Sequence, residues 1–126
     1  MNIFLQPCSS RIAQQHYSNT IVNLNLNLDL IKSFLVYKDY QNLYNMFQND
    51  TIHIWGVTKN SANKWDKIKI GDIALFAKNK YIFSYGVICY KLKNSQLANF
   101  LWEEDEKGQT WENIYFLTEL KNTNIN

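Results

Sequence analysis

The alternation of hydrophobic and polar residues predicts several short strands, most of them in the second half of the chain. Residues 51–57 (Thr-Ile-His-Ile-Trp-Gly-Val) are rich in β-branched and aromatic side chains, which favours a strand. Residues 73–77 form an apolar run short enough for a buried strand. Further strands are predicted at residues 2–6, 81–92 (with a bend at Gly86) and 113–120.

Short helices are predicted between and before these strands. Polar residues that commonly cap helix N-termini precede several of the amphipathic segments. The predicted caps are Ser9 or Ser10, Asp29, Ser61, and Asn94 or Ser95. The predicted helical segments cover residues 11–17, 30–37, 43–47, 61–68 and 94–101.

This order of elements predicts a single α+β domain. Short strands joined largely without intervening helices often curl into a small barrel. We expect a curled, mostly antiparallel sheet or barrel of five to six strands with short flanking helices. A chain of 126 residues has the length of one domain. Its expected parts are a helical N-terminal portion (1–48), a strand-rich portion (51–120) and a frayed polar tail (121–126).

Composition narrows the class of protein. Hydrophobic residues make up 46% of the chain and charged residues 19%, which excludes a disordered acidic segment. There is no run of 18 apolar residues and no signal-peptide pattern at the N-terminus, so we expect a cytoplasmic protein without membrane contact. Aromatic residues reach 15%, and all four tryptophans (Trp55, Trp65, Trp102 and Trp111) lie in the second half.

The charges are segregated along the chain. Between residues 59 and 93, eight lysines accompany two aspartates, whereas residues 103–112 hold five carboxylates and one lysine. The basic stretch is typical either of a solvated surface or of a rim that follows a phosphate backbone. Arg11 is the only arginine, so phosphate contacts would fall to lysines and backbone amides.

Enzymatic motifs are weak. Cys8 and Cys89 match no metal or redox spacing, and we expect both to be buried free thiols. His16 and His53 belong to no zinc motif, and no Gly-rich phosphate loop occurs. The carboxylates of residues 103–106 lie side by side in one loop, an arrangement poorly suited to converge on a metal. The residues therefore predict a binding module without a metal or cofactor, and not an enzyme.

The stretch from Ile52 to Leu120 resembles the YTH/EVE group of PUA-like domains. The resemblance lies in the order of its pieces: Ile54–Thr58 (Ile-Trp-Gly-Val-Thr), the Gly71–Asp72 turn into a strand ending at Phe76, Phe83–Val87 (Phe-Ser-Tyr-Gly-Val), Leu101–Trp102, an acidic loop with Gly108, and the strand Ile114–Leu117. The N-terminal pieces, Phe4–Pro7 and then His16–Tyr17, are similar to the DNA-reading domains of McrB-type modification-dependent restriction GTPases.

The resemblance implies an aromatic cage for a methylated base. By motif, its walls fall on Trp55 and Trp102. The position of the third wall falls near Lys107, which is not aromatic, so Trp111, Tyr85 or a leucine would take its place. Aromatic faces stack on an extruded base, and an apolar corner holds its methyl group. Expected base-edge contacts are Thr58 and Asn60, and expected phosphate contacts are Lys59, Lys64, Lys67, Lys78 and Lys80.

The function expected from this resemblance is that of a methylated-DNA reader that flips a base. It would be the specificity domain of a modification-dependent restriction system, with an AAA+ GTPase motor and a nuclease subunit elsewhere. Methyladenine is the first expected base and methylcytosine the second. The alternatives are a PUA-like module for modified RNA, a small nuclease that uses the acidic loop, and a protein-interaction domain whose aromatic residues form an interface.

Overall fold

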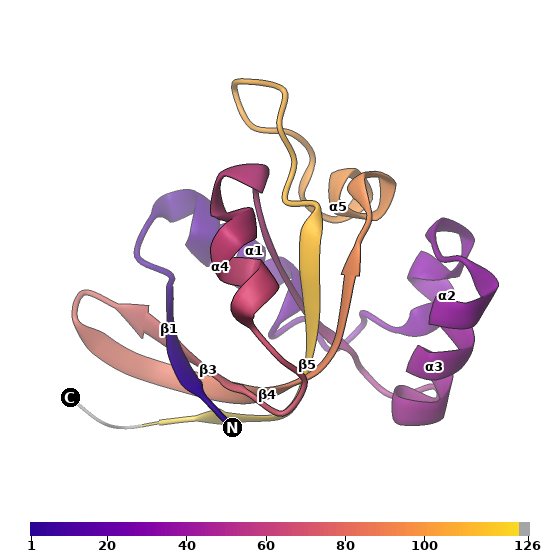
Figure 1. Cartoon of the computed structure of the whole chain (residues 1–126), viewed down its shortest axis with the longest axis horizontal. Helices are drawn as coiled ribbons and strands as arrows, with labels where there is room; N and C mark the ends of the chain where they lie inside the picture. Colours follow the sequence, from indigo (N-terminus) through magenta and orange to yellow (C-terminus); the bar gives the residue numbers. More distant parts are fainter. Residues whose placement is uncertain (124–126) are drawn as a thin grey trace.

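A five-stranded curled sheet forms the centre of the domain (Figure 1), in a computed structural model that describes residues 1–123. The strands are β1 (Ile3–Pro7), β2 (His53–Val57), β3 (Ile73–Lys78), β4 (Tyr81–Lys93) and β5 (Asn113–Asn122). Their order in the sheet is β1-β3-β4-β5-β2. Strands β1 and β3 are parallel, and the other three pairs are antiparallel. The predicted α+β class and mostly antiparallel curled sheet are confirmed, with a form consistent with a PUA/EVE-like half-barrel.

Short helices flank both faces of the sheet. They are α1 (Arg11–Thr20), α2 (Leu28–Ile31), η1 (Lys32–Phe34), α3 (Tyr37–Phe47), η2 (Lys59–Ser61), α4 (Ala62–Lys67) and α5 (Ser95–Trp102). The side chain of Ser10 caps α1, and that of Asn94 caps α5. The predicted cap at Asp29 is wrong: the N-cap of α2 is Asn27, whose side chain accepts the hydrogen bond from the Leu30 amide.

Strand β5 is buried on both faces, which divides the hydrophobic interior into two cores. Side chains alternate between the two faces of a strand. Tyr115 and Leu117 face what we call the α1/α4 core, which also contains Cys8, Ile21, Trp55, Ala74, Phe76 and Ile88. Ile114 and Phe116 face the α3/α5 core, which contains Leu43, Phe47, Ile54, Leu97 and Trp102 among others. Helices α2 and α3 form the lobe at the right of Figure 1.

The end of β5 is longer than predicted. The strand continues to Asn122, and the Thr123 amide donates to the Phe83 carbonyl at 2.9 Å. The predicted frayed tail is therefore wrong for residues 121–123, while residues 124–126 lie outside the described part of the chain. The predicted bend at Gly86 coincides with a register shift between Tyr85 and Val87, where β4 pairs with β5.

Both cysteines are free thiols, as predicted. Cys8 is buried just after β1, as predicted, whereas Cys89, which was also predicted to be buried, is only half-buried in β4. Burial raises the pKa of each thiol to about 11. Within residues 1–123, none of the helices has the length and apolar character needed to cross a membrane.

We predict that Gly56→Ala destabilises the domain, because Trp102 and the 110–112 segment pack directly onto this glycine. A Cβ atom at Gly56 would lie 2.5 Å from Trp102 Cζ3 and 2.5 Å from the Trp111 carbonyl oxygen. Overpacking of this kind costs about 1–3 kcal/mol, measurable by urea denaturation. Gly86→Ala is the matched control, because the nearest atoms to its Cβ would belong to leucine side chains, at 3.1 Å or more. Equal stability of the two variants would contradict the packing described.

Candidate nucleic-acid interface

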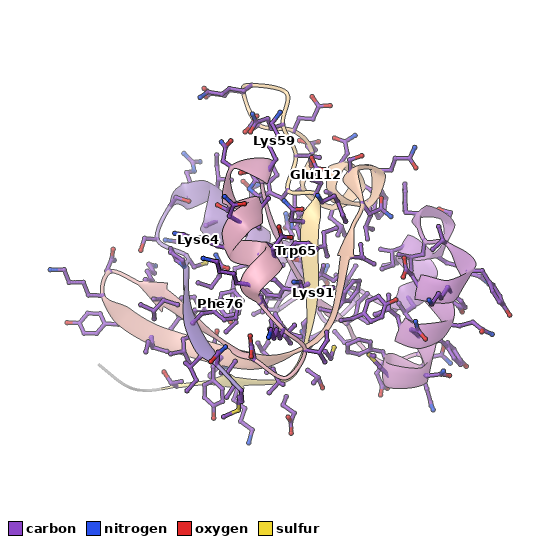
Figure 2. All side chains as sticks on the ribbon, in the orientation of Figure 1. Lys59, Lys64, Trp65, Phe76, Lys91 and Glu112 are labelled. Carbon is purple, nitrogen blue, oxygen red and sulfur yellow. The ribbon has the colours of Figure 1, made fainter. Side chains whose placement is uncertain are left out.

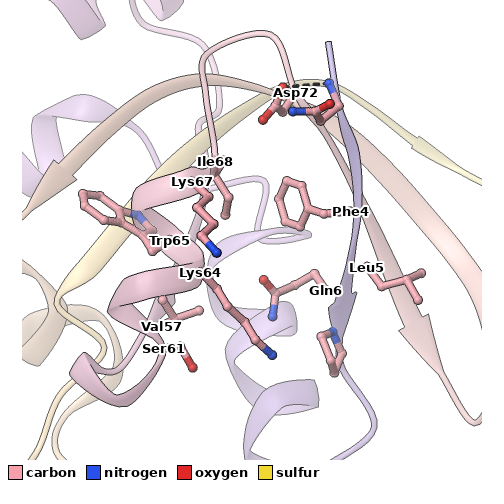
Figure 3. A pocket seen from close by; sticks show the side chains of 12 residues that line it. Phe4, Leu5, Gln6, Val57, Ser61, Lys64, Trp65, Lys67, Ile68 and Asp72 are labelled. Carbon is pink, nitrogen blue, oxygen red and sulfur yellow. Dashed lines mark hydrogen bonds between the residues drawn. The ribbon is translucent and has the colours of Figure 1, made fainter.

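A cavity with a volume of about 630 Å³ opens between β1 and α4. We call it the barrel-mouth pocket, because it lies where the sheet fails to close between its edge strands β1 and β2. Its lining is mainly apolar, with a few polar groups (Figure 3). The lining residues are Asn2, Phe4, Leu5, Gln6, Pro7, Val57, Ser61, Lys64, Trp65, Lys67, Ile68 and Asp72.

Strand β1 contributes Phe4 and Gln6 to the pocket wall. Because side chains alternate along a strand, these two residues face inward while Ile3 and Leu5 are exposed on the opposite face. The Phe4 ring packs edge-on against Tyr115, with 6.1 Å between ring centroids. An aromatic surface on the inner face of an edge strand is therefore available at the cavity.

Gln6 is held in one orientation by Tyr115. The Tyr115 hydroxyl donates to Gln6 Oε1 at 2.8 Å, and Tyr115 is completely buried at the centre of the sheet. Burial raises the pKa of Tyr115 well above its usual value, so the hydroxyl keeps its proton. Only an acceptor can satisfy that buried proton. With Oε1 bound to Tyr115, the Nε2 amide hydrogens of Gln6 are left to donate at the cavity.

Helix α4 forms the opposite wall and is fixed to the sheet by Lys91 and Trp65. Lys91 Nζ donates to the carbonyl oxygens of Trp65 and Ile68, at 2.7 and 2.6 Å, and lies 4.1 Å from the centroid of a Trp65 ring. Partial burial lowers the pKa of Lys91. The Trp65 indole N–H donates to the Ile114 carbonyl at 3.2 Å. Lys91 therefore holds the C-terminal end of α4 against the sheet, and its charge is not free on the surface.

The turn before β3 closes one end of the pocket through Asp72. Its carboxylate accepts hydrogen bonds from the amides of Asn2, at 2.9 Å, and Lys69, at 2.8 Å. These bonds lower the pKa of Asp72, so the buried carboxylate is ionised. They tie the beginning of β1 to the β3 turn and hold the Phe4 segment in place.

The predicted phosphate-binding lysines lie in three separate places. Lys64 and Lys67 line the barrel-mouth pocket and extend toward β1 (Figure 3). Lys59 lines a shallower polar cavity together with Glu104 and Glu112, near the acidic loop (Figure 2). Lys78 and Lys80 lie at the β3–β4 hairpin. The structure thus places one basic pair, not five lysines, at the mouth of the pocket.

The predicted four-residue cage does not assemble. Trp55 faces the α1/α4 core, where it contacts Phe76 at 5.2 Å between centroids, whereas the adjacent Gly56 faces Trp102. Trp55 and Trp102 therefore lie on opposite faces of β2 and cannot enclose the same base. Both are buried, and their indole N–H groups have no hydrogen-bond partner among the described residues.

The other predicted site residues are also dispersed. Tyr85 pairs with Leu75 across β3–β4, so it lies on the sheet face opposite Phe76 and away from the α1/α4 core. Trp111 and Trp102 lie in the same part of the fold, because the His16 ring contacts both of them. Thr58 and Asn60 lie in the segment between β2 and α4, beside Val57 and Ser61, but neither lines the barrel-mouth pocket.

Sequence reasoning missed Phe4, Gln6 and Ser61 as pocket residues and gave Trp65 a packing role. One signal was present: Gln6 is a polar residue at an inward position of an otherwise apolar strand. Its significance depends on Tyr115, which lies 109 residues away. No local pattern shows that pairing.

The architecture belongs to the class of open, curled α+β half-barrels with a cavity at the unclosed edge. Neither a family model nor a curated protein matches the chain. Among solved structures, it is similar to the N-terminal domain of Thermococcus gammatolerans McrB bound to m5C DNA, with a TM-score of 0.73 and 18% sequence identity. The match covers 98% of this chain and 77% of that one. The predicted resemblance to a McrB N-terminal domain is confirmed at the level of fold, and the YTH/EVE assignment stays a prediction.

Proposed function

We propose that this domain reads a methylated base in duplex DNA and holds the extruded base in the barrel-mouth pocket. The observation that carries the proposal is the cavity itself. It has a mainly apolar interior, the amide of Gln6 held by Tyr115, and Lys64 and Lys67 at its rim. Its volume of about 630 Å³ is large enough for a nucleobase and lies within the usual range for ligand sites. The fold shared with a domain bound to methylated DNA supports the same function.

The pocket offers a separate contact for each part of a flipped nucleotide. The Phe4 ring would stack on the base, which contributes about 1–3 kcal/mol per base. Val57 and Ile68 provide an apolar surface for the methyl group. Lys64 and Lys67 would contact the phosphates beside the extruded nucleotide, and binding would weaken as salt increases.

The oriented amide of Gln6 favours a base that presents an acceptor. A flipped cytosine presents N3 and O2 as acceptors on its Watson–Crick edge, whereas thymine carries a proton on N3. The structural neighbour was bound to m5C DNA. Adenine also presents an acceptor, N1, so the amide of Gln6 does not separate these two bases. The methylated cytosine bound by the neighbour is the reason that we place 5-methylcytosine before methyladenine, which reverses the order expected from sequence.

This function assigns binding, and not catalysis, to the domain. In a modification-dependent restriction system it would supply specificity, while a GTPase motor and a nuclease subunit carry out the later steps. The nuclease alternative gains no support from the acidic loop, because Asp105 Oδ1 accepts hydrogen bonds from the amides of Lys107 and Gln109. Residues 1–123 contain no group of three or more potential metal ligands.

We predict that the domain binds a duplex containing 5-methylcytosine more tightly than matched unmodified and N6-methyladenine duplexes. Fluorescence anisotropy at two salt concentrations measures these affinities, and an RNA of the same sequence tests the alternative ligand through its 2′-hydroxyls. Phe4→Leu should weaken methylated-duplex binding about tenfold by removing the stacking ring. Phe100→Leu, an exposed position on α5, is the matched control. Equal affinity for all duplexes would contradict the proposal, as would tighter binding of RNA.

We predict that Gln6 distinguishes 5-methylcytosine from thymine, two bases that carry the same methyl group. Each base is placed opposite an abasic site, so that extrusion breaks no base pair. Gln6→Glu replaces a donor with an acceptor, and the preference for 5-methylcytosine over thymine should fall about tenfold or reverse. Gln15→Glu, which makes the same charge change on α1, is the control. An unchanged preference in Gln6→Glu would show that Gln6 does not read the base.

A further inference from the structure

The turn between β3 and β4 carries a positive patch that lies outside the barrel-mouth pocket. Its four residues, Lys78, Asn79, Lys80 and Tyr81, are all exposed, and we call them the hairpin tip. The tip lies at the left of Figure 1, on the opposite side of the domain from the lobe of α2 and α3. Its charge is therefore accessible to a partner.

The sequence segments that meet at the hairpin tip carry almost no negative charge. Residues 1–28, which include β1 and α1, contain no aspartate or glutamate, and neither do residues 73–102. Strand β5 also runs beside β4, and its only carboxylate, Glu119, lies where β5 pairs with residues 85–87. A positive patch on an exposed hairpin, with few carboxylates to balance it, attracts an anion.

The backbone of the hairpin tip is strained at Lys80. The turn has two central residues, Asn79 and Lys80, whose φ angles are 50° and 72°. Positive φ at both positions marks a type I′ turn, for which Asn-Gly is the preferred sequence because glycine adopts positive φ without a steric cost. Since the Lys80 side chain is exposed, packing does not offset that cost. Backbone strain of this kind is concentrated at functional sites, so it indicates a role for the charge.

The hairpin tip is held beside one end of the barrel-mouth pocket. Pro7, which lines the pocket, pairs with Ala77, the residue before the tip. The Asn79 amide donates to Ser9 Oγ at 3.0 Å, which fixes the turn against the segment that leads into α1. Residues in a strand are about 3.3 Å apart, so the centre of the turn lies about 7–10 Å beyond the Pro7–Ala77 pair, or about two or three base-pair steps of duplex DNA.

We propose that the hairpin tip is a second DNA-contact surface, which binds the sugar–phosphate backbone on one flank of the extruded base. The inference rests on the proposed function, because the barrel-mouth pocket sets where the duplex lies. Lys78 and Lys80 supply cations for phosphates, and the exposed Tyr81 ring would pack against a deoxyribose. The tip lies beyond the Pro7 end of the pocket and not beyond its Asp72 end, so the contact is one-sided. It adds affinity without reading the methyl group.

Lys80→Gly tests the inference, because it removes the charge and also gives the turn its preferred Asn-Gly sequence. We expect the variant to unfold at a higher urea concentration than the unaltered domain, yet to bind the 5-methylcytosine duplex about fivefold more weakly at low salt. The slope of log K against log salt should fall in magnitude by about 1, with the preference for 5-methylcytosine retained. Lys38→Gln removes one exposed charge from α3 and is the control, which should bind like the unaltered domain.

A second measurement locates the contact on the duplex. Uncharged methylphosphonate linkages replace the phosphates about two to four steps from the methylated base, first on its 5′ flank and then on its 3′ flank. The loss of affinity caused by Lys80→Gly should disappear on one of these duplexes and persist on the other, because one charge pair can be lost only once.

Three results would overturn the inference. Unchanged affinity and salt slope in Lys80→Gly, with the preference for 5-methylcytosine intact, would overturn it and leave the proposed function standing. A loss that is the same on both modified duplexes would show that the tip does not bind one flank. Equal affinity for methylated and unmodified duplexes would overturn the proposed function and this inference together.

Discussion

The burial of β5 on both faces is the constraint on which the rest of the domain depends. All five residues from Asn113 to Leu117 are buried, and neighbouring side chains enter different cores. Strand β2 pairs with this segment, so its residues follow the same alternation: Trp55 shares a face with Tyr115, and Gly56 shares a face with Ile114. A one-residue change of register would exchange the two faces entirely. The alternation therefore decides which aromatic residues can meet.

This division gives the domain two cavities of different character. On one face, the curled sheet leaves a gap between its edge strands, and α4 lines that gap with lysines. On the other face, Trp102 packs onto Gly56, and the acidic loop surrounds His16. Opposite charge at the two openings means that an anionic duplex is attracted to only one of them. The acidic loop between α5 and β5 projects at the top of Figure 1.

Most of the fold could be predicted from the sequence, because the signals for strands and helices lie in neighbouring residues. The caps at Ser10 and Asn94, the turn at Gly71–Asp72 and the apolar run of β3 each depend on a few neighbouring residues. The site was less accessible, because it depends on which sheet face each residue occupies. The sequence order alone makes both Trp55 and Trp102 candidate cage walls. The pairing of β2 with β5 shows that the two side chains lie on opposite faces of β2.

Long-range partners account for the remaining differences. Tyr115 orients Gln6 from the other end of the chain, and Lys91 fixes α4 from the middle of β4. Neither interaction can be recognised from a motif in the sequence. The resemblance to McrB-type domains led to the correct architecture, but a fold carries many sites. Of the cage residues transferred by motif, Trp102 and Trp111 line the cavity beside His16, whereas Trp55 and Tyr85 line neither that cavity nor the barrel-mouth pocket.

The location of the base is the central claim, and an NMR measurement tests it directly. A duplex carrying 5-methylcytosine with a ¹³C-labelled methyl group is bound to the unlabelled domain, and nuclear Overhauser effects from that methyl are recorded. If the base enters the barrel-mouth pocket, the methyl group contacts the side chains of Phe4 and Val57. Contacts to the rings of Trp102 and Trp111, with none to Phe4, would contradict it.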